Sequence, residues 1–395
     1  MMTKPDYEGK GFYNVSQTVL EYFGVDHEGK PLDASVPQND GLALFLFDAL
    51  GISTMEKAGL LNYPHHEITS VFPSTTATAL TTLFTAKKPS EHGVLGFQTF
   101  VREMGGIVNM LSVAYPAGSQ IPVPYEKLVS PGERIGKRLS ASGVNCTAVL
   151  PKSVSNTPMS NFDDDGFSRI VPYFDLWDLR ANVERELEKP GRRFLYVYVP
   201  YVDTLSHHYG PYSQEAGAAA RDLLEFFEEV AAKAKDYTLL ATADHGQVEV
   251  DPAQVPPREL LSLLELPPYG DSRAMFLKTR HPNEVKSYLH DQFPDFQVMT
   301  KEEVLASGII GDSITPYEER LGDLLVLPQG RRLLIYPYLE VNESFQFKGH
   351  HGGLSEEEQK IPLFVRPERP QPAMSKKASL RSASAVLTSR LACAY

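Results

Sequence analysis

The sequence predicts an α/β fold in which a mostly parallel central sheet is flanked by helices. The first observation behind this prediction is a set of short apolar runs typical of buried strands, at residues 42–47, 145–150, 194–199, 237–243 and 360–365. The second is that helical patterns alternate with most of these runs, at residues 53–61, 76–86, 131–142, 177–187 and 213–234. This alternation favours helices packed against a parallel sheet. The third is that Asp or His stands near one end of several runs, as expected where strand ends open into a crevice.

Residues 1–256 and 341–368 are predicted to form the main domain, with a polar lead-in over 1–38 that contains one helix at 13–23. Residues 257–340 are predicted to form a small α/β insertion. Its strands are expected at residues 272–278, 296–299, 323–327 and 332–336, and its helices at 282–293 and 301–307. The tail 369–395 is rich in Ser, Ala, Lys and Arg, so we expect it to be partly frayed.

The bulk composition excludes several classes of protein. The 395 residues carry a formal net charge of -12, which argues against an extended nucleic-acid-binding surface and against binding to anionic membranes. Cys146 and Cys393 are too few for a disulfide framework. The start of the chain has no apolar core of a signal peptide, and no apolar run approaches the ~20 residues of a spanning helix. A cytoplasmic protein without a membrane partner is therefore expected, and its oligomeric state is not predicted.

Three Asp and three His next to the apolar runs are candidate metal ligands: Asp48, Asp203, His207, Asp244, His245 and His351. Oxygen and nitrogen donors in this number suit two zinc-like ions. Asp203 and His207 stand four residues apart, so they can face one ion if the segment is helical. Asp244 and His245 can do so only if the backbone bends after them, and Gly246 allows that bend. Each cluster alone is also compatible with a turn or a helix cap.

The segment Pro73-Ser-Thr-Thr-Ala carries consecutive hydroxyls directly before a helical pattern. One interpretation is that Ser74 or Thr75 caps the helix. The other places one hydroxyl beside a metal ion, which lowers its pKa, at a helix end that favours an incoming phosphate. The residues alone leave both interpretations open.

Five motifs together resemble the alkaline phosphatase superfamily, nearest its nucleotide pyrophosphatase and type I phosphodiesterase branch, over about residues 41–365. They are Phe-Asp48-Ala-Leu-Gly, Thr76…Thr85-Ala-Lys-Lys-Pro-Ser-Glu-His92-Gly, Asp203-Thr-Leu-Ser-His207-His-Tyr-Gly-Pro, Ala-Asp244-His245-Gly and Gly-His-His351-Gly-Gly. The resemblance implies an alkaline-phosphatase-like sheet and two divalent metal ions, zinc by preference with manganese as the alternative. It assigns to one ion Asp203, His207 and His351. It assigns to the other Asp48, Thr76, Asp244 and His245.

The resemblance also implies a reaction: hydrolysis of a phosphodiester or pyrophosphate bond, in a small-molecule substrate such as a nucleotide, through a phosphothreonine on Thr76. Thr75 is the alternative nucleophile, and His92 is interpreted as structural. Alternative functions on the same metal core are a phosphomonoesterase or a phosphonoacetate-type hydrolase, and a more remote one is an inactive binding protein. Lys87 and Lys88 could then bind a second anionic group.

One departure from the family pattern concerns substrate binding. The family's phosphodiesterases carry an Asn soon after the His-Gly pair, where this sequence reads Val94-Leu-Gly-Phe97. Asn109 is the candidate replacement. Phe97, Phe100 and Tyr115 are candidates for a platform under a base or an apolar leaving group, or else they pack in the core.

Overall fold

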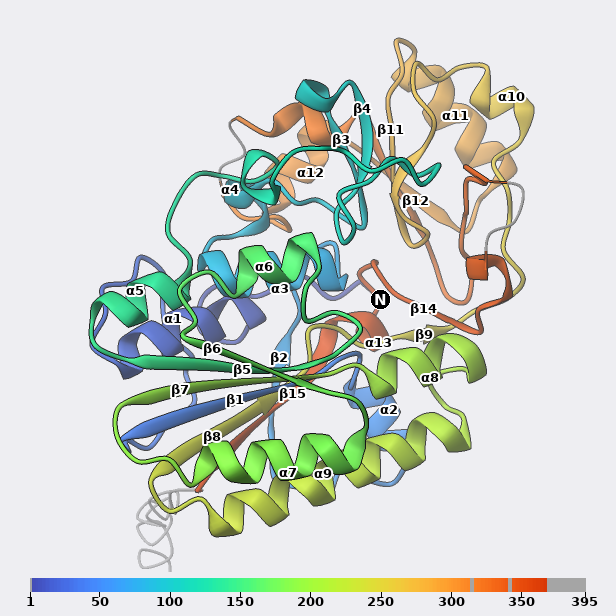
Figure 1. Ribbon diagram of the computed structural model, residues 1–395. Helices are drawn as coiled ribbons and strands as arrows, with labels where there is room; N and C mark the ends of the chain where they lie inside the picture. Colours follow the sequence, from blue (N-terminus) through green and yellow to red (C-terminus); the bar gives the residue numbers. More distant parts are fainter. Residues whose placement is uncertain (1, 313–315, 340–342, 368–395) are drawn as a thin grey trace, which may run out of the picture.

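The computed structural model describes residues 2–312, 316–339 and 343–367, so the predicted tail 369–395 lies outside the described residues (Figure 1). Its main sheet has seven strands in the order β2-β15-β8-β1-β7-β5-β6. Their bounds are β1 Gly41–Phe47, β2 His66–Thr69, β5 Asn145–Pro151, β6 Arg169–Tyr173, β7 Arg193–Val199, β8 Tyr237–Thr242 and β15 Lys360–Arg366. The five strands from β8 to β6 are parallel, and β15 pairs antiparallel with β8 and β2. The mostly parallel sheet that the sequence predicted is confirmed.

Helices cover both faces of this sheet (Figure 1). One face carries α2 (Ile52–Lys57), α7 (Leu176–Leu187) and α9 (Gln214–Lys233), and the other α1 (Phe12–Tyr22), α3 (Thr76–Thr85), α5 (Ile135–Ala141) and α6 (Pro158–Asp163). Every residue of β1 is buried, and the rings of Phe45 and Phe47 contact Phe227 of α9. The lead-in is more than a polar extension, because all but one residue of α1 is buried and α1 packs on α3.

A second sheet of six strands has the order β12-β13-β11-β10-β3-β4, and all of its pairs are antiparallel. It comprises β3 Gln98–Val101, β4 Gly106–Asn109, β10 Tyr269–Asp271, β11 Ala274–Leu277, β12 Phe296–Thr300 and β13 Leu324–Pro328. Helices α10 (Arg258–Leu261), α11 (Pro282–Gln292) and α12 (Lys301–Ser307) accompany it. Since β3 and β4 precede the predicted insertion 257–340, the second sheet joins two separate segments. The division of the chain into domains stays a proposal.

The strand predicted at residues 332–336 is wrong. Leu334 forms only an isolated bridge with Gln254. The apolar side chains of this run are buried without a ladder, because Leu333 and Ile335 pack in a small cluster with Val248 and Val250.

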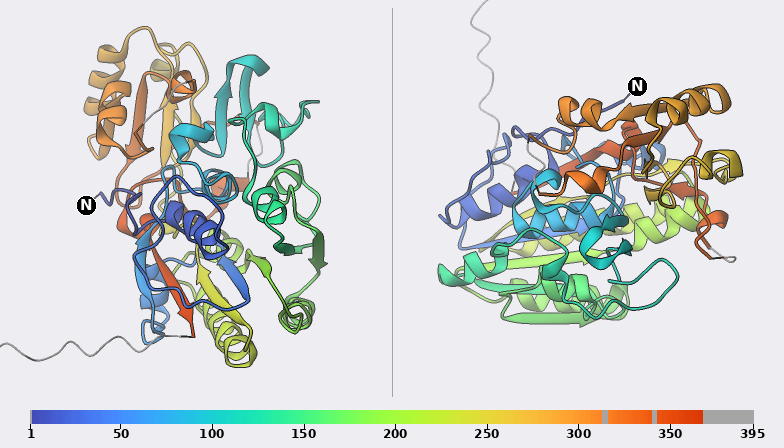
Figure 2. Two further views of the ribbon diagram at one scale, coloured as in Figure 1. Left: turned by 90° about the vertical axis from the view of Figure 1, so that its left-hand side faces the viewer. Right: turned by 90° about the horizontal axis from the view of Figure 1, so that it is seen from above.

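The second sheet lies over the edge of the main sheet where β1, β7 and β8 end (Figure 2). The remaining short elements are α4 Pro89–His92, α8 Tyr201–Tyr209, β9 Val248–Glu249, β14 Gly349–His350 and α13 Glu356–Gln359. Among the described residues, no helix combines the length and the apolar content needed to cross a membrane.

Candidate metal centre and nucleophile

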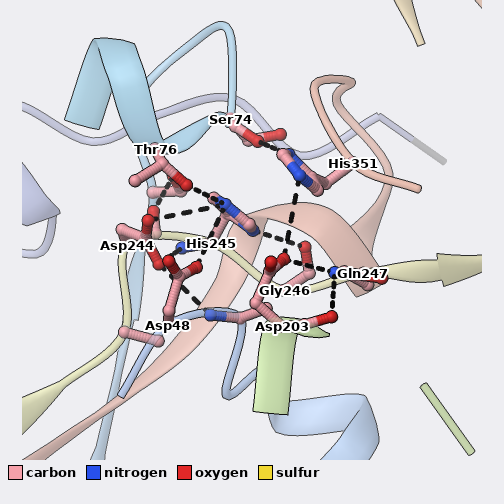
Figure 3. A network of polar contacts seen from close by, with 12 residues as sticks. Asp48, Ser74, Thr76, Asp203, Asp244, His245, Gly246, Gln247 and His351 are labelled. Carbon is pink, nitrogen blue, oxygen red and sulfur yellow. Dashed lines mark hydrogen bonds and ion pairs between the residues drawn. The ribbon is translucent and has the colours of Figure 1, made fainter. Parts of the chain in front are cut away.

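All seven residues predicted as metal ligands lie together at this edge, and six of them are labelled in Figure 3. Asp48 and Asp244 directly follow the ends of β1 and β8, as expected of the carboxyl ends of neighbouring parallel strands. Asp203 and His207 stand on α8, which follows β7, and His351 follows β14. The ligand atoms form two overlapping groups, each within 4.8 Å: one of Asp48, Asp244 and His245, and one of Asp203, His245 and His351.

The first group is buried, and two of its carboxylate oxygens lack hydrogen-bond partners among the described residues. The Nε2 atom of His245 lies 3.6 Å from Asp48 Oδ1 and 3.4 Å from Asp244 Oδ2. Neither of these two buried oxygens has a hydrogen-bond partner in the described part of the chain. The other oxygens are engaged: Tyr198 donates to Asp48 Oδ2, and the N–H groups of Ala49 and His245 donate to Asp244 Oδ1 over 3.2 and 3.1 Å. Each carboxylate thus presents one unengaged oxygen, and a buried charge of this kind needs a counter-ion.

Burial raises the pKa of Asp48 well above its ordinary value, and the charges of Asp244 and Asp203 raise it further. Three carboxylates therefore crowd into one buried space. A divalent cation supplies the positive charge that offsets their repulsion, so the donor set fits the ions that the sequence implied.

The second group orients its imidazoles for metal binding. His207 Nε2 lies 3.3 Å and His351 Nε2 3.9 Å from Asp203 Oδ1. The Nδ1 atom of His207 is 2.8 Å from the carbonyl oxygen of Gly349, and that of His351 is 3.0 Å from the carbonyl oxygen of Ser74. A backbone carbonyl oxygen can only accept a hydrogen bond, so Nδ1 carries the proton and Nε2 is left as an electron-pair donor.

His245 follows the same pattern, because its Nδ1 atom lies 3.0 Å from the carbonyl oxygen of Gly246. Its ring stacks on that of His351, with centroids 3.8 Å apart, so the two groups adjoin (Figure 3). Burial lowers the pKa of His351 well below its ordinary value, with further lowering by His245 and His207. His351 is therefore neutral, which is the form that binds a metal ion.

The other histidines of these motifs have different surroundings. His350 lies 2.8 Å from the Ser272 hydroxyl and 3.1 Å from the carbonyl oxygen of Ser344, toward the second sheet. His92 is fully buried between the Thr82 hydroxyl at 2.9 Å and the N–H group of Val94 at 3.1 Å. Burial lowers the pKa of His92 to about 3, so it is a neutral structural residue.

The three consecutive hydroxyls before α3 have different partners. Ser74 donates to the carbonyl oxygen of Gly353 over 2.9 Å, and Thr75 is hydrogen-bonded to the carboxylate of Asp271. Thr76 is the first residue of α3, and its hydroxyl lies 3.2 Å from His245 Nε2. The Thr76 hydroxyl is therefore directed at the candidate ligands (Figure 3).

Two residues at the centre escaped the sequence analysis. Gln247 is fully buried and donates from Nε2 to Asp203 Oδ1 over 2.6 Å, and Tyr198 donates to Asp48. The position of Gln247, directly after the Asp-His-Gly motif, was a usable signal. Tyr198 had none, because it reads as one more residue of an apolar strand.

Replacing Gln247 by Leu is expected to lower the affinity for metal ions about 10–100-fold, since Asp203 loses the hydrogen bond that orients it. Competition with a chromogenic chelator measures this affinity. Gln38→Leu is the matched control, because Gln38 is exposed and precedes the opposite end of β1. Equal affinities in the Gln247→Leu variant and the unsubstituted protein would contradict the orienting role.

A cavity of about 390 Å³ lies between the candidate ligands and the second sheet. Thr76, Asp203, His207 and His351 line one side, and the aromatic residues of the wall are Phe97, Tyr269, Tyr336 and Phe347. Phe97 is thus placed where the sequence predicted a substrate contact. Lys87 donates instead to Ser130, and Lys88 pairs with Asp312 at 2.6 Å.

The structure does not bring Asn109 to this cavity. Its side-chain oxygen accepts from the N–H groups of Leu111 at 3.0 Å and Ser112 at 3.3 Å, which is typical of an Asn that closes a turn. Phe100 packs on Tyr269 inside the second sheet, and the Tyr115 hydroxyl donates to the carbonyl oxygen of Met104. Among the predicted substrate contacts, Phe97 alone lines the wall.

Comparisons with known proteins identify the family and the fold. The family model for type I phosphodiesterase / nucleotide pyrophosphatase matches residues 51–354. Murine ectonucleotide pyrophosphatase / phosphodiesterase 5 is similar in structure, with a TM-score of 0.61 and 18% identity, over 82% of this chain and 87% of that one. An inactive threonine-to-alanine variant of that protein, in complex with AMP, matches with a TM-score of 0.61 and 17% identity, over 83% of this chain and 87% of that one. Phosphonoacetate hydrolase from Sinorhizobium meliloti 1021, solved with phosphonoformate, matches with a TM-score of 0.61 and 16% identity, over 88% of this chain and 95% of that one. No curated protein sequence matches the chain.

Proposed function

Because the chain belongs to the type I phosphodiesterase / nucleotide pyrophosphatase family of the alkaline phosphatase superfamily, we propose that it is a two-metal phosphoryl-transfer hydrolase that cleaves a phosphodiester or pyrophosphate bond. The observation that carries the proposal is the position of one threonine hydroxyl, that of Thr76, beside two groups of Asp and His side chains. In this proposal Asp203, His207 and His351 hold one ion, and Asp48, Asp244, His245 and Thr76 hold the other. Histidine nitrogen with carboxylate oxygen suits zinc, with manganese as the alternative.

When bound, two such ions activate a hydroxyl and offset the charge on a leaving oxygen. Thr76 loses its proton to solvent and its Oγ1 attacks phosphorus, while the bond to the leaving oxygen breaks. The leaving group takes up a proton and departs as an alcohol, and the phosphoryl group with its remaining substituent is then carried by Thr76. Water next attacks phosphorus, which frees Thr76 and gives a phosphate monoester. Because Thr76 opens α3, a helix of ten residues, the unpaired N–H groups of the first turn are placed to bind phosphoryl oxygens.

The cavity wall supports a nucleotide over a phosphonoacetate-like substrate. The murine relative was solved with AMP, and the partly exposed aromatic side chains of Phe97, Tyr336 and Phe347 offer surfaces on which a base can stack. No Lys or Arg is found among the described residues that line the cavity. A second carboxylate or phosphate of a substrate therefore finds no cationic partner there. A small-molecule diester with a neutral or aromatic leaving group therefore fits best. A phosphomonoesterase or a phosphonoacetate-type hydrolase stays the second candidate, since the latter has a solved relative.

The direct test compares bis(p-nitrophenyl) phosphate with p-nitrophenyl phosphate, using protein purified with zinc and assayed for bound metal. We expect turnover of the diester to exceed that of the monoester. Asp244→Ala should lower both metal content and turnover, because the carboxylate faces the first group of ligands. Asp251→Ala is the matched control, as Asp251 is exposed and pairs with Arg331. A protein that binds no metal and turns over neither substrate would instead be a binding protein on this scaffold.

A further inference from the structure

A second, smaller chamber adjoins Thr76 under α6. Its volume is about 200 Å³, and its wall includes Asp48, Thr76 and Asp203. Because Thr76 and Asp203 also line the larger cavity, the nucleophile lies where the two spaces meet. A phosphodiester at Thr76 can therefore place one substituent in each chamber.

Two buried polar groups of this chamber lack hydrogen-bond partners among the described residues. Asp163 is 3% exposed and Tyr196 is 2% exposed. Neither the Oδ1 atom of Asp163 nor the Tyr196 hydroxyl has a hydrogen-bond partner within residues 2–312, 316–339 and 343–367. Burying polar atoms without partners is costly, so both atoms indicate a ligand that hydrogen-bonds to them. The proposed metal ligands do not account for them, because neither residue belongs to the two ligand groups.

The chamber is lined by acidic side chains. Asp164 lines it beside Asp163, and no Lys or Arg is found among its described lining residues. The nearby Arg134 stacks on the ring of Phe162 at 4.0 Å, and its Nε atom is 3.8 Å from Asp165. Burial raises the pKa of Asp163 well above its ordinary value, and that of Asp164 to about 7. A positive charge inside the chamber would favour the ionised form of both carboxyl groups.

Most of the rest of the wall is apolar, with the side chains of Leu80, Phe84, Leu150, Val154 and Met159. The hydroxyls of Thr157 and Ser160 also line it, and they are hydrogen-bonded to each other. Such a wall suits an organic cation better than a hydrated metal ion. In the part of the chain that the structure describes, neither Asp163 nor Asp164 joins a group of three metal-ligating side chains. The unpartnered oxygens of Asp163 and Tyr196 can both accept hydrogen bonds, which a primary ammonium donates and a quaternary one does not.

We propose that this chamber binds a primary ammonium group of the substrate, carried on the substituent that stays on phosphorus. The leaving group then departs into the larger cavity, which Asp203, His207 and His351 line. This inference rests on the proposed phosphodiesterase function and adds a substrate class to it, namely aminoalkyl phosphodiesters.

The test compares p-nitrophenyl 2-aminoethyl phosphate with its neutral isostere p-nitrophenyl propyl phosphate, using the zinc-loaded protein. We expect kcat/KM to favour the aminoethyl diester about tenfold or more, because a site built to hydrogen-bond a group discriminates against an analogue that lacks it. Asp163→Asn and Asp164→Asn should each reduce that ratio toward unity. Asp165→Asn is the control and should keep the ratio, since Asp165 pairs with Lys137 and does not line the chamber.

Two outcomes overturn the inference: equal kcat/KM for the two diesters, or a preference that survives both Asn substitutions. A thermal melt shows that each variant is folded, and the half-buried Asp164 provides a second variant if Asp163→Asn does not fold. Turnover of bis(p-nitrophenyl) phosphate separates the two proposals. If this diester is hydrolysed without any ammonium preference, only the chamber assignment fails, and if no diester is hydrolysed, the proposed function fails.

Discussion

Thr76→Ala is expected to reduce diester turnover by about 10⁴-fold or more while the two proposed metal ions stay bound. The substitution removes the attacking oxygen, whereas Asp48, Asp244 and His245 still hold their places around the same ion site. Steady-state assays measure the loss of turnover, and elemental analysis of the purified variant measures the metal content. In the unsubstituted protein, acid quenching during turnover followed by mass spectrometry should find a phosphoryl group on the peptide that contains Thr76.

Two further variants fix the register of the nucleophile. Thr76→Ser should retain turnover, because it keeps a hydroxyl on the first residue of α3. Thr75 is directed at Asp271, so Thr75→Ala should not reproduce the loss seen with Thr76→Ala. If Thr75→Ala abolishes turnover and Thr76→Ala does not, the assignment of the nucleophile is wrong by one residue.

Arg273→Met is expected to lower the free energy of unfolding by about 3–5 kcal/mol. Arg273 is 1% exposed, and its guanidinium makes two hydrogen bonds to the fully buried carboxylate of Glu358, over 3.1 and 3.0 Å. Removing the guanidinium leaves a buried negative charge without its counter-ion. Urea denaturation of both proteins measures the difference.

The pair also bears on the metal centre. Glu358 accepts from the N–H group of Gly353 over 2.9 Å, in the loop that follows His351. Arg273→Met should therefore weaken metal binding as well. The double variant Arg273→Met/Glu358→Gln should recover part of the stability, because the amide oxygen is neutral and still accepts from Gly353. Arg280→Met is the control, since Arg280 is 82% exposed and pairs with Glu265 at the surface, where an ion pair contributes little. If Arg273→Met and Arg280→Met lowered the free energy of unfolding by similar amounts, the stabilising role of the buried pair would be contradicted.

The main sheet and its ligand-bearing ends were predictable because their signals are local. Continuous apolar runs such as Leu42–Phe47 indicate strands buried on both faces, and an Asp or His at the end of such a run is easily recognised. The second sheet was harder to predict. Strands β3 and β4 have four residues each, and β3 pairs with β10 about 170 residues later, which no local pattern encodes.

The errors have specific physical causes. The run Arg332–Tyr336 is as apolar as a strand, but Leu333 and Ile335 are buried by packing on Val248 and Val250, and the backbone pairs only through one isolated bridge. Asn109 was chosen for its amide, yet Asn side chains often bind the neighbouring backbone, and here that local contact prevails. The chamber beside Thr76 could not have been found from the sequence, because Asp163 and Tyr196 meet only through the packing of α6 on the sheet.

The position of β15 has a consequence for biosynthesis. β15 is the last strand among the described residues, yet it lies inside the sheet, between β2 and β8. While the ribosome is still making residues 243–359, the emerging β8 has an uncovered edge on that side, and an uncovered edge favours pairing with other chains. His351 also emerges late, so an unfinished chain lacks one of the proposed zinc ligands. We therefore expect the nascent protein to depend on chaperones until β15 has been inserted.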